Sequence, residues 1–320
     1  MNLFYSDTFE LPLPDGHRFP MAKYRRLRER LQNAPFRESL QFHLPPSTTD
    51  EQLLLVHTPE YLKSIRSGQL SALQQRRIGF PWSEKMVERS RRSTGASIAA
   101  GRAAMVGGLA ANLAGGTHHS FAECGQGYCV FNDTCVAARV LQQESQVENV
   151  LIVDLDVHQG NGTAAIVRDD PSIFAFSVHC NKNYPFQKTS GDFDLALEEG
   201  TGDEEYVAAV SDALEQIDRY FEADLVFYLA GADPFAGDRL GLLNLTKPGL
   251  ARRDRLVINY FRDRNVPLAL AMAGGYAPDL DDIVDIHFQT IEIAVERLIL
   301  ERKKLDVSTT GHGEEDVGKS

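Results

Sequence analysis

The sequence predicts an α/β protein built on an open, mostly parallel sheet flanked by helices. Apolar runs without polar–apolar alternation are typical of strands that are buried on both faces, as in parallel sheets. Each run of this kind ends at a polar or glycine-rich turn, and helical patterns separate them, which favours repeated βαβ units. The predicted strands are 109–114, 150–153, 173–177, 225–230 and 266–272.

Helical patterns fill the chain around these strands. A loop at 12–20 leads into a basic helix at 21–31, whose lysine and arginines we interpret as one solvated face. Residues 48–69 predict helices, and Pro59 is placed to open the second, since proline is favoured at the first helical position. The segment 83–108 is rich in alanine and glycine, which suits close helix packing. Further helices are expected at 207–221, 247–264 and 279–301.

Length and charge limit the classes of protein to consider. The 320 residues suffice for one α/β domain, which we expect over 1–302, followed by a polar and flexible tail at 303–320. The net charge of −12 argues against direct nucleic-acid binding, because phosphate contacts need clustered lysine and arginine. The same charge is compatible with attraction of cationic substrates.

Hydropathy and cysteine usage predict a cytoplasmic protein without a membrane partner. No apolar run is long enough to cross a bilayer, and the N-terminal residues lack the pattern of a secretory signal. The cysteines form no C-x-x-C pair, which argues against a zinc–cysteine cluster or a disulfide framework. Reduced thiols fit a cytoplasmic location. The oligomeric state is left open.

The most informative stretch is 150–162, where a buried strand runs into polar residues. Asp154, Asp156 and His158 occupy alternate positions, so they project from one face at the carboxyl end of the strand. Ligands bind at that edge of open α/β sheets. A helix-capping role is the simpler alternative, but three such residues in register favour a metal site, because aspartate is seldom buried without a partner.

Polar clusters also follow three of the other strands, and a parallel sheet would bring all of them to one crevice. Asp156, His158 and Asp233 would give a metal three ligands and leave an open position for water and substrate. The adjacent His118 and His119 could transfer protons near neutral pH.

Two further polar groups could orient those histidines, and a phenol could complete the site. Asp154 and Asn161 are available as imidazole partners. Tyr276 follows Gly274 and Gly275, and a phenol donor opposite a metal can stabilise an oxyanion. Each motif alone is weak, since Gly-Gly-Tyr is usually a turn. Their combination at strand ends indicates metal-assisted hydrolysis of an amide.

These motifs resemble those of the histone deacetylase superfamily, which includes acetylpolyamine amidohydrolases. The matching segments are 116–119, 127–133, 154–162, 232–235 and 274–276. Asn161 in place of an aspartate, Gln159, and the loop Asn183-Tyr184-Pro185 make the class IV type and its bacterial relatives the nearest resemblance. The family's fold would be an eight-stranded parallel sheet flanked by helices, the arginase–deacetylase type.

The resemblance implies a zinc amidohydrolase that removes an acyl group, most simply acetyl, from a lysine side chain or similar amine. One Zn²⁺ per chain would be held by Asp156, His158 and Asp233. His119 would act as general base and then acid, His118 as an electrostatic aid, and Tyr276 would polarise the acyl carbonyl. The asparagine at 161 leaves open which histidine moves the proton, because an amide stabilises an imidazolium less than a carboxylate does.

The resemblance also implies residues for substrate and for a second ion. Gly127 and Tyr128 would line the substrate tunnel, with Gly274 and Gly275 beside it, and Arg18 would match a position that gates an exit channel for acetate. Asp154 and Ser177, with backbone carbonyls near His158, would hold a monovalent cation such as K⁺.

Other functions remain open at this stage. An acetylpolyamine or a longer-chain acyl-lysine is an alternative substrate to acetyl-lysine. A dimanganese ureohydrolase would need extra ligands where Gly160 and Gly231 stand, and a non-catalytic acyl-lysine reader would not need the complete set of catalytic residues. The acidic loop 181–205 could draw cationic substrates to the pocket, or it could simply be a solvated surface loop.

Overall fold

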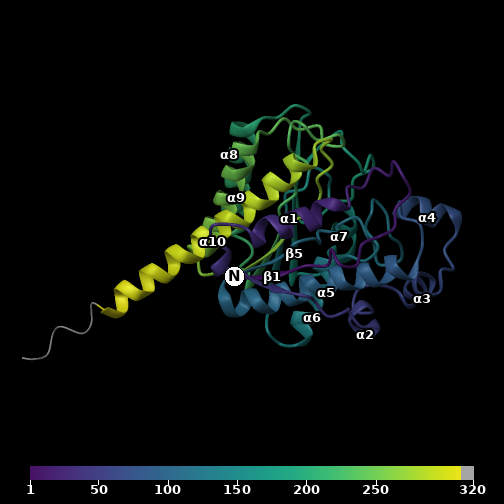
Figure 1. The fold of residues 1–320 in the computed structure, drawn as a ribbon, viewed down its shortest axis with the longest axis horizontal. Helices are drawn as coiled ribbons and strands as arrows, with labels where there is room; N and C mark the ends of the chain where they lie inside the picture. The colour runs from purple at the N-terminus through teal and green to yellow at the C-terminus, as the bar shows by residue number, and fades with distance from the viewer. Residues whose placement is uncertain (311–320) are drawn as a thin grey trace, which may run out of the picture.

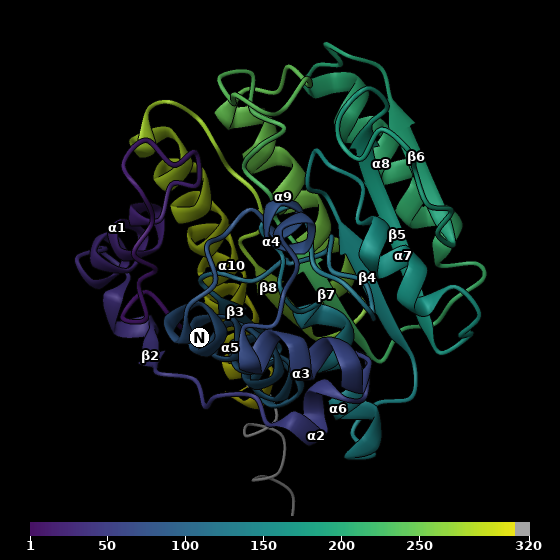
Figure 2. The same cartoon turned by 90° about the vertical axis from the view of Figure 1, so that its right-hand side faces the viewer.

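The predicted fold class is confirmed by a computed structural model, which describes residues 1–310 and the side chains of residues 1–304. Eight strands form one sheet in the order β2-β1-β3-β8-β7-β4-β5-β6, and every neighbouring pair is parallel. Figure 2 shows these strands side by side across the molecule. The central strands are the ones whose apolar runs are evident in the sequence.

All five strands predicted from apolar runs are present, with ends shifted by a few residues. They are β3 (Leu109–Asn112), β4 (Val150–Asp154), β5 (Ile173–Cys180), β7 (Leu225–Leu229) and β8 (Leu268–Ala271). The remaining strands, β1 (Asn2–Phe4), β2 (Gln41–His43) and β6 (Phe193–Leu197), were not predicted by the pattern. They are short and lie toward the edges of the sheet, so they lack a long buried run.

Helices cover the sheet on both faces. The first half of the chain contributes α1 (Ala22–Gln32), α2 (Asp50–Leu53), α3 (Pro59–Ser67), α4 (Ala72–Ile78), α5 (Glu84–Gly107), α6 (Asp133–Gln143) and α7 (Asn161–Val167). The second half contributes α8 (Asp203–Ile217), α9 (Lys247–Arg262) and α10 (Leu280–Thr310). Pro59 opens α3 as expected, with Thr58 as its N-cap. Helices α4, α6 and α7 are not predicted by the sequence pattern.

Two apolar cores lie on opposite faces of the sheet, and β4 contributes to both. Val150 and Ile152 pack with residues of α3, α5 and α6, whereas Leu151 and Val153 pack with residues of α1, α8, α9 and α10. Because successive strand residues point to opposite faces, an uninterrupted apolar run is what burial on both faces requires. The last helix, α10, packs on the second of these faces and continues beyond the body of the molecule (Figure 1).

Two expectations about polar segments concern α1 and α10. The basic helix α1 is not a uniformly solvated face, because Lys23 is only 2% exposed. Its ammonium group donates hydrogen bonds to the carbonyl oxygens of Ala273 (3.2 Å) and Gly275 (3.3 Å). Helix α10 runs to Thr310, past residue 302 where a tail was expected, and residues 311–320 lie outside the described part of the chain.

Two further expectations concern membrane-spanning helices and the state of the cysteines. No helix there is both long enough and apolar enough to span a bilayer. The cysteines, of which Cys129, Cys135 and Cys180 are buried, all carry free thiols.

We predict that α5 tolerates alanine at one glycine and not at another. A Cβ at Gly95 would lie 2.0 Å from the Pro46 carbonyl oxygen, so Gly95→Ala should lower the free energy of unfolding by about 1–3 kcal/mol. A Cβ at Gly107 meets nothing within 4 Å, so Gly107→Ala should leave stability unchanged or raise it by up to about 1 kcal/mol. Urea unfolding measures both, and equal stability of the two variants would contradict the packing.

Candidate active site

The predicted strand-end clusters converge because their strands are neighbours. The sheet order β3-β8-β7-β4 places the four relevant carboxyl ends next to one another at the middle of the sheet. Polar residues after β3, β4, β7 and β8 therefore share one region, as the sequence predicts. The side chains brought together there are His118, His119, Asp154, Asp156, His158, Asp233 and Tyr276.

Asp156, His158 and Asp233 form the candidate metal site. Each offers one ligand atom, and these atoms all lie within 4.8 Å of one another. The Nδ1 atom of His158 is 3.0 Å from Oδ1 of Asp156 and 3.3 Å from Oδ2 of Asp233. All three residues are buried, and Oδ2 of Asp233 has no hydrogen-bond partner among the described residues. An unpartnered buried carboxylate oxygen beside two further ligands fits a divalent metal.

Backbone N–H groups hold the two carboxylates in place. The N–H of Val157 donates to Oδ1 of Asp233 (3.0 Å), and the N–H of Gly274 donates to Oδ2 of Asp156 (2.8 Å). A Cβ at Gly274 would lie 1.9 Å from Oδ2 of Asp233, so only glycine allows this approach. The loop after β8 is thus shaped around the carboxylates.

The ionisation of these ligands shows how strongly the site attracts positive charge. Burial and the neighbouring Asp156 raise the pKa of Asp233 to about 7. Burial alone would lower the pKa of His158, but the adjacent carboxylates of Asp156 and Asp233 outweigh it and raise the pKa to about 10. Two carboxylates enclosed together need a compensating cation, which a proton or a divalent metal can supply.

His118 and His119 differ in their partners. Nδ1 of His118 lies 2.6 Å from Oδ2 of Asp154, whereas Nδ1 of His119 lies 2.8 Å from Oδ1 of Asn161. The two rings are 4.2 Å apart between centroids. A charged carboxylate orients one imidazole and a neutral amide the other, so the pair is electrostatically asymmetric.

This asymmetry separates the ionisation of the two rings. Burial lowers the pKa of His118, but the charges of Asp154 and Asp156 outweigh it and raise the pKa to about 9. Burial and the positive charges of His118 and His158 hold the pKa of His119 well below its usual range. At neutral pH one ring is therefore an imidazolium and the other a neutral base.

Tyr276 follows Gly274 and Gly275 in the loop after β8 and faces the same space. Its ring centroid is 6.5 Å from that of His158, at an interplanar angle of 84°. Its backbone N–H donates to Asp238 (2.5 Å). Burial and the charges of Asp156 and Asp233 raise the pKa of Tyr276 well above its usual value, so the phenol keeps its proton and can donate a hydrogen bond.

Lys23 is a residue of this region that the sequence analysis assigned to the surface. Its ammonium group lies 5.4 Å from the ring centroid of Tyr276 and bonds the carbonyls on either side of Gly274. It therefore supports the loop that carries Tyr276. Because α1 contains several other basic residues, nothing in the local sequence indicates that this lysine is buried.

A cavity of about 630 Å³ opens from the surface to His119, His158 and Tyr276, and we call it the mouth. Gly127 and Tyr128, the expected tunnel residues, line it. A Cβ at Gly127 would lie 2.6 Å from Cδ2 of His119, so this wall also needs glycine.

Tyr184 forms a further wall of the mouth that the sequence analysis did not assign. Its ring packs edge-on against His119, with centroids 5.0 Å apart, and its hydroxyl donates to Gln126 (2.7 Å). The motif Asn183-Tyr184-Pro185 was noticed as part of the family resemblance. Nothing local in it indicates contact with a histidine that lies 65 residues earlier.

Arg18 is exposed and lines the mouth. Its expected role at an exit channel stays a prediction. A smaller internal space of about 40 Å³ borders His118 and is lined instead by Arg89, which is 7% exposed. The guanidinium of Arg89 lies 5.0 Å from the ring centroid of Tyr24.

The expected monovalent-cation residues lie on neighbouring strands. Asp154 of β4 and Ser177 of β5 are register partners. Asp154 bonds His118, and Oγ of Ser177 lies 3.0 Å from Nδ1 of His179. Their role with a cation stays a prediction.

The acidic loop does not give the mouth a negative rim. Lys182 to Phe186 do reach the mouth, but the carboxylates further along are used elsewhere. Asp192 accepts from the N–H of Ala175 (2.8 Å), and Asp194 accepts from the side chain of Gln159 (2.8 Å). No aspartate or glutamate of the described residues lines the mouth. The expected acidic rim is therefore wrong.

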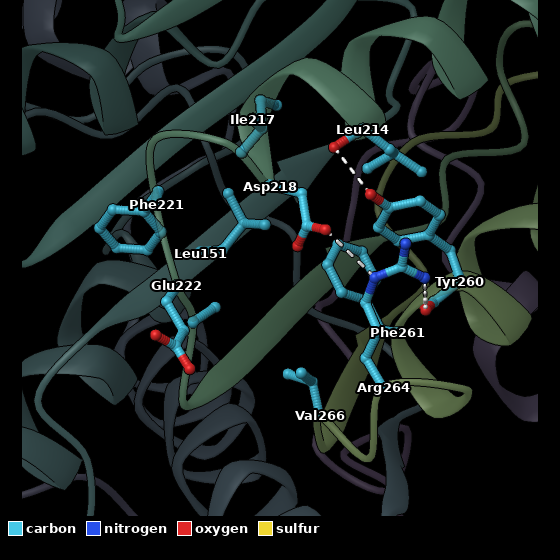
Figure 3. A pocket seen from close by; sticks show the side chains of 11 residues that line it. Leu151, Leu214, Ile217, Asp218, Phe221, Glu222, Tyr260, Phe261, Arg264 and Val266 are labelled. Atoms are coloured by element: carbon cyan, nitrogen blue, oxygen red, sulfur yellow. Dashed lines mark hydrogen bonds and ion pairs between the residues drawn. The ribbon is translucent and has the colours of Figure 1, made fainter.

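A second cavity, of about 340 Å³, lies at the opposite end of the strands (Figure 3). It is lined by residues near the amino ends of β4, β7 and β8. Two pairs of its polar groups are already engaged, since Arg264 binds Asp218 (3.2 Å) and the hydroxyl of Tyr260 donates to the Leu214 carbonyl (3.1 Å). We assign no chemistry to it.

Comparisons with known proteins agree with this fold and these motifs. A family model described as the histone deacetylase domain matches residues 17–291. An uncharacterized protein of Picosynechococcus sp. is 43% identical, over 88% of this chain and 94% of its own. Histone deacetylase 2 of Arabidopsis thaliana is 31% identical, over 86% of this chain and 74% of its own.

Solved structures show the same fold at lower identity. The HD domain of HDA15 superposes with a TM-score of 0.79 and 22% identity, and the match covers 92% of this chain and 88% of that one. At this identity the likeness concerns the fold alone. The family model, which covers most of the chain, and the relatives above show that this protein belongs to the histone deacetylase family.

Proposed function

We propose that this protein is a zinc-dependent amidohydrolase that removes an acetyl group from lysine side chains. The observation that carries the proposal is the convergence of a three-ligand metal site, an imidazolium–imidazole pair and a protonated phenol around the inner end of one cavity. Membership of a deacetylase family supports the reaction class.

Asp156, His158 and Asp233 would hold the zinc ion. When bound, zinc polarises the acyl carbonyl and lowers the pKa of water at its open position. The ligand set of two carboxylates and one imidazole suits Zn²⁺ but accepts other divalent ions such as iron.

His119 is the proposed general base. Its Nδ1 is engaged by Asn161, which leaves Nε2 available to take a proton from the attacking water. The same nitrogen would then deliver that proton to the leaving amine. The low pKa of His119 supports this choice over His118, whose ring already carries a proton and contributes positive charge to the site.

Tyr276 is the proposed oxyanion donor. Its hydroxyl remains protonated and faces the space beside His158, so it can donate a hydrogen bond to the carbonyl oxygen as negative charge develops there. Gly274 and Gly275 belong to the loop that positions the side chain of Tyr276. The interaction acts mainly on the transition state.

The mouth would admit an extended acyl-lysine side chain between Tyr128 and Tyr184. Arginines on its rim disfavour acetylated polyamines, which were the main alternative substrate, because polyamines are cations. We also propose that Asp154 and Ser177 contribute to a K⁺ site beneath the histidine pair.

A two-metal ureohydrolase is less well supported. Among the described residues, one group with metal-ligand geometry is found, and it has three members. Gly160 and Gly231 stand where further ligands would be needed. A non-catalytic acyl-lysine reader would not require the asymmetric histidine pair.

The metal content of the purified protein, measured with its hydrolysis of an acetyl-lysine peptide, tests the proposal directly. We expect about one zinc per chain and turnover. Asp233→Ala should lose both metal and activity, because two remaining ligands bind zinc weakly. Asp212→Ala, an exposed carboxylate of α8, is the matched control and should retain both. Two manganese ions, or one zinc without turnover of any acyl amide, would overturn the proposal.

Tyr276→Phe should lower kcat by about 10²–10³-fold while the zinc content stays at the wild-type level. The phenylalanine keeps the ring that packs against Tyr128 but removes the hydroxyl donor. Steady-state kinetics and metal analysis on the same preparation separate the two effects. A wild-type kcat would exclude the oxyanion role.

Asn161→Asp should move the acidic limb of the pH–kcat profile to higher pH. A carboxylate 2.8 Å from Nδ1 favours the charged form of His119 and raises its pKa. Because the base works only when neutral, activity should then be lost at a higher pH as the solution is acidified. Asn33→Asp, on the exposed end of α1, is the control. An unshifted limb would indicate that His119 is not the base.

A further inference from the structure

The mouth of the active site carries a concentration of positive charge. Its charged lining residues are all cations, and no carboxylate of the described chain lines it. This is unexpected in a protein of net charge −12. The cationic side chains are Arg18, Arg76, Arg77, Lys182 and Arg239.

The four arginines of this set are exposed and make no ion pair with the described residues, so their charge is not neutralised within the protein. Some exposed arginines elsewhere pair with carboxylates, as Arg252 does with Glu204 and Arg264 with Asp218, whereas others, such as Arg219, form no ion pair with the described residues. Lys182 is the exception at the mouth, since it lies 3.0 Å from Glu199.

The cations come from separate parts of the chain. Arg18 lies in the loop before α1, Arg76 and Arg77 lie in the last turn of α4, and Arg239 follows β7. Segments that are far apart in sequence thus place positively charged side chains around one opening. Such a convergence raises the local potential at the mouth and attracts anionic groups.

The arrangement also indicates where the negative charge of a ligand would lie. His119 and His158, at the inner end of the cavity, are only 5% and 7% exposed. The arginines are exposed, so they surround the part of the substrate that stays outside. Phe186, which is 88% exposed, adds an apolar contact on the same rim. A peptide that carries the acyl-lysine inward would leave its neighbouring residues against these groups.

We infer that the substrate is an acidic peptide or protein segment, in which aspartate or glutamate residues flank the acylated lysine. This inference rests on the proposed deacetylase function and names the substrate class of that site. Arginine suits the role because its planar guanidinium pairs with carboxylates through two parallel hydrogen bonds. Exposed pairs of this kind are screened by salt, so the preference is expected to depend on ionic strength.

The test compares three acetyl-lysine peptides of equal length, with acidic, neutral or basic flanking residues. At low salt, kcat/KM should be about tenfold higher for the acidic peptide than for the basic one, and the ratio should shrink at high salt. Arg18→Glu and Arg76→Glu should each reduce or reverse the ratio. Arg219→Glu, an exposed arginine between α8 and β7, is the matched control and should leave the ratio unchanged.

Three outcomes would overturn the inference: an equal rate on all three peptides, a preference for the basic peptide or an acetylated polyamine, or an acidic preference that both mouth variants retain. A neutral peptide with succinyl-lysine is included as well. If the enzyme preferred this peptide to the acidic acetyl peptide, the arginines would recognise a negatively charged acyl group and not acidic flanking residues. That result would also overturn the inference. Absence of turnover on every peptide would instead overturn the deacetylase function, and fluorescence anisotropy with the same peptides would still report the charge preference.

Discussion

The structure depends on the burial of two carboxylates at the carboxyl ends of adjacent central strands. Asp156 and Asp233 are 2% and 0% exposed, and enclosed anions are costly unless cations and hydrogen bonds compensate them. The surrounding loops supply that compensation through backbone N–H groups and the imidazole of His158. Gly274 completes the arrangement because its lack of a side chain lets the next loop reach both carboxylates.

The same excess of negative charge organises the proton-handling groups. His118 is close to Asp154 and Asp156 and carries a proton, whereas His119 bonds the uncharged Asn161 and stays neutral. Two adjacent residues of identical chemistry thereby acquire different roles. This difference supports the proposal that His119 is the ring that accepts a proton, because burial and the nearby positive charges of His118 and His158 keep it neutral.

Local charge and total charge diverge in this molecule. The chain is acidic overall, yet the mouth of its active site is lined by arginines. The acidic loop 181–205 could have formed a negative rim. Its carboxylates instead accept hydrogen bonds from neighbouring backbone and side-chain donors, such as the N–H of Ala175. The net charge of the chain therefore does not predict the charge at the mouth. The fold decides which charged side chains form ion pairs and which remain free to bind a ligand.

The sequence by itself determined the central strands and the candidate metal ligands Asp156 and His158, because these depend on contiguous signals. A run such as 150–154 is apolar on both faces, and Asp156 and His158 follow it in fixed register. Tertiary structure alone decided the burial of Lys23, the wall formed by Tyr184 and the meeting of Arg18 with Arg76. These features join segments that are distant along the chain, so no local pattern reveals them. The three-residue strands β1 and β2 form for the same reason, since their stability comes from the neighbours they pair with.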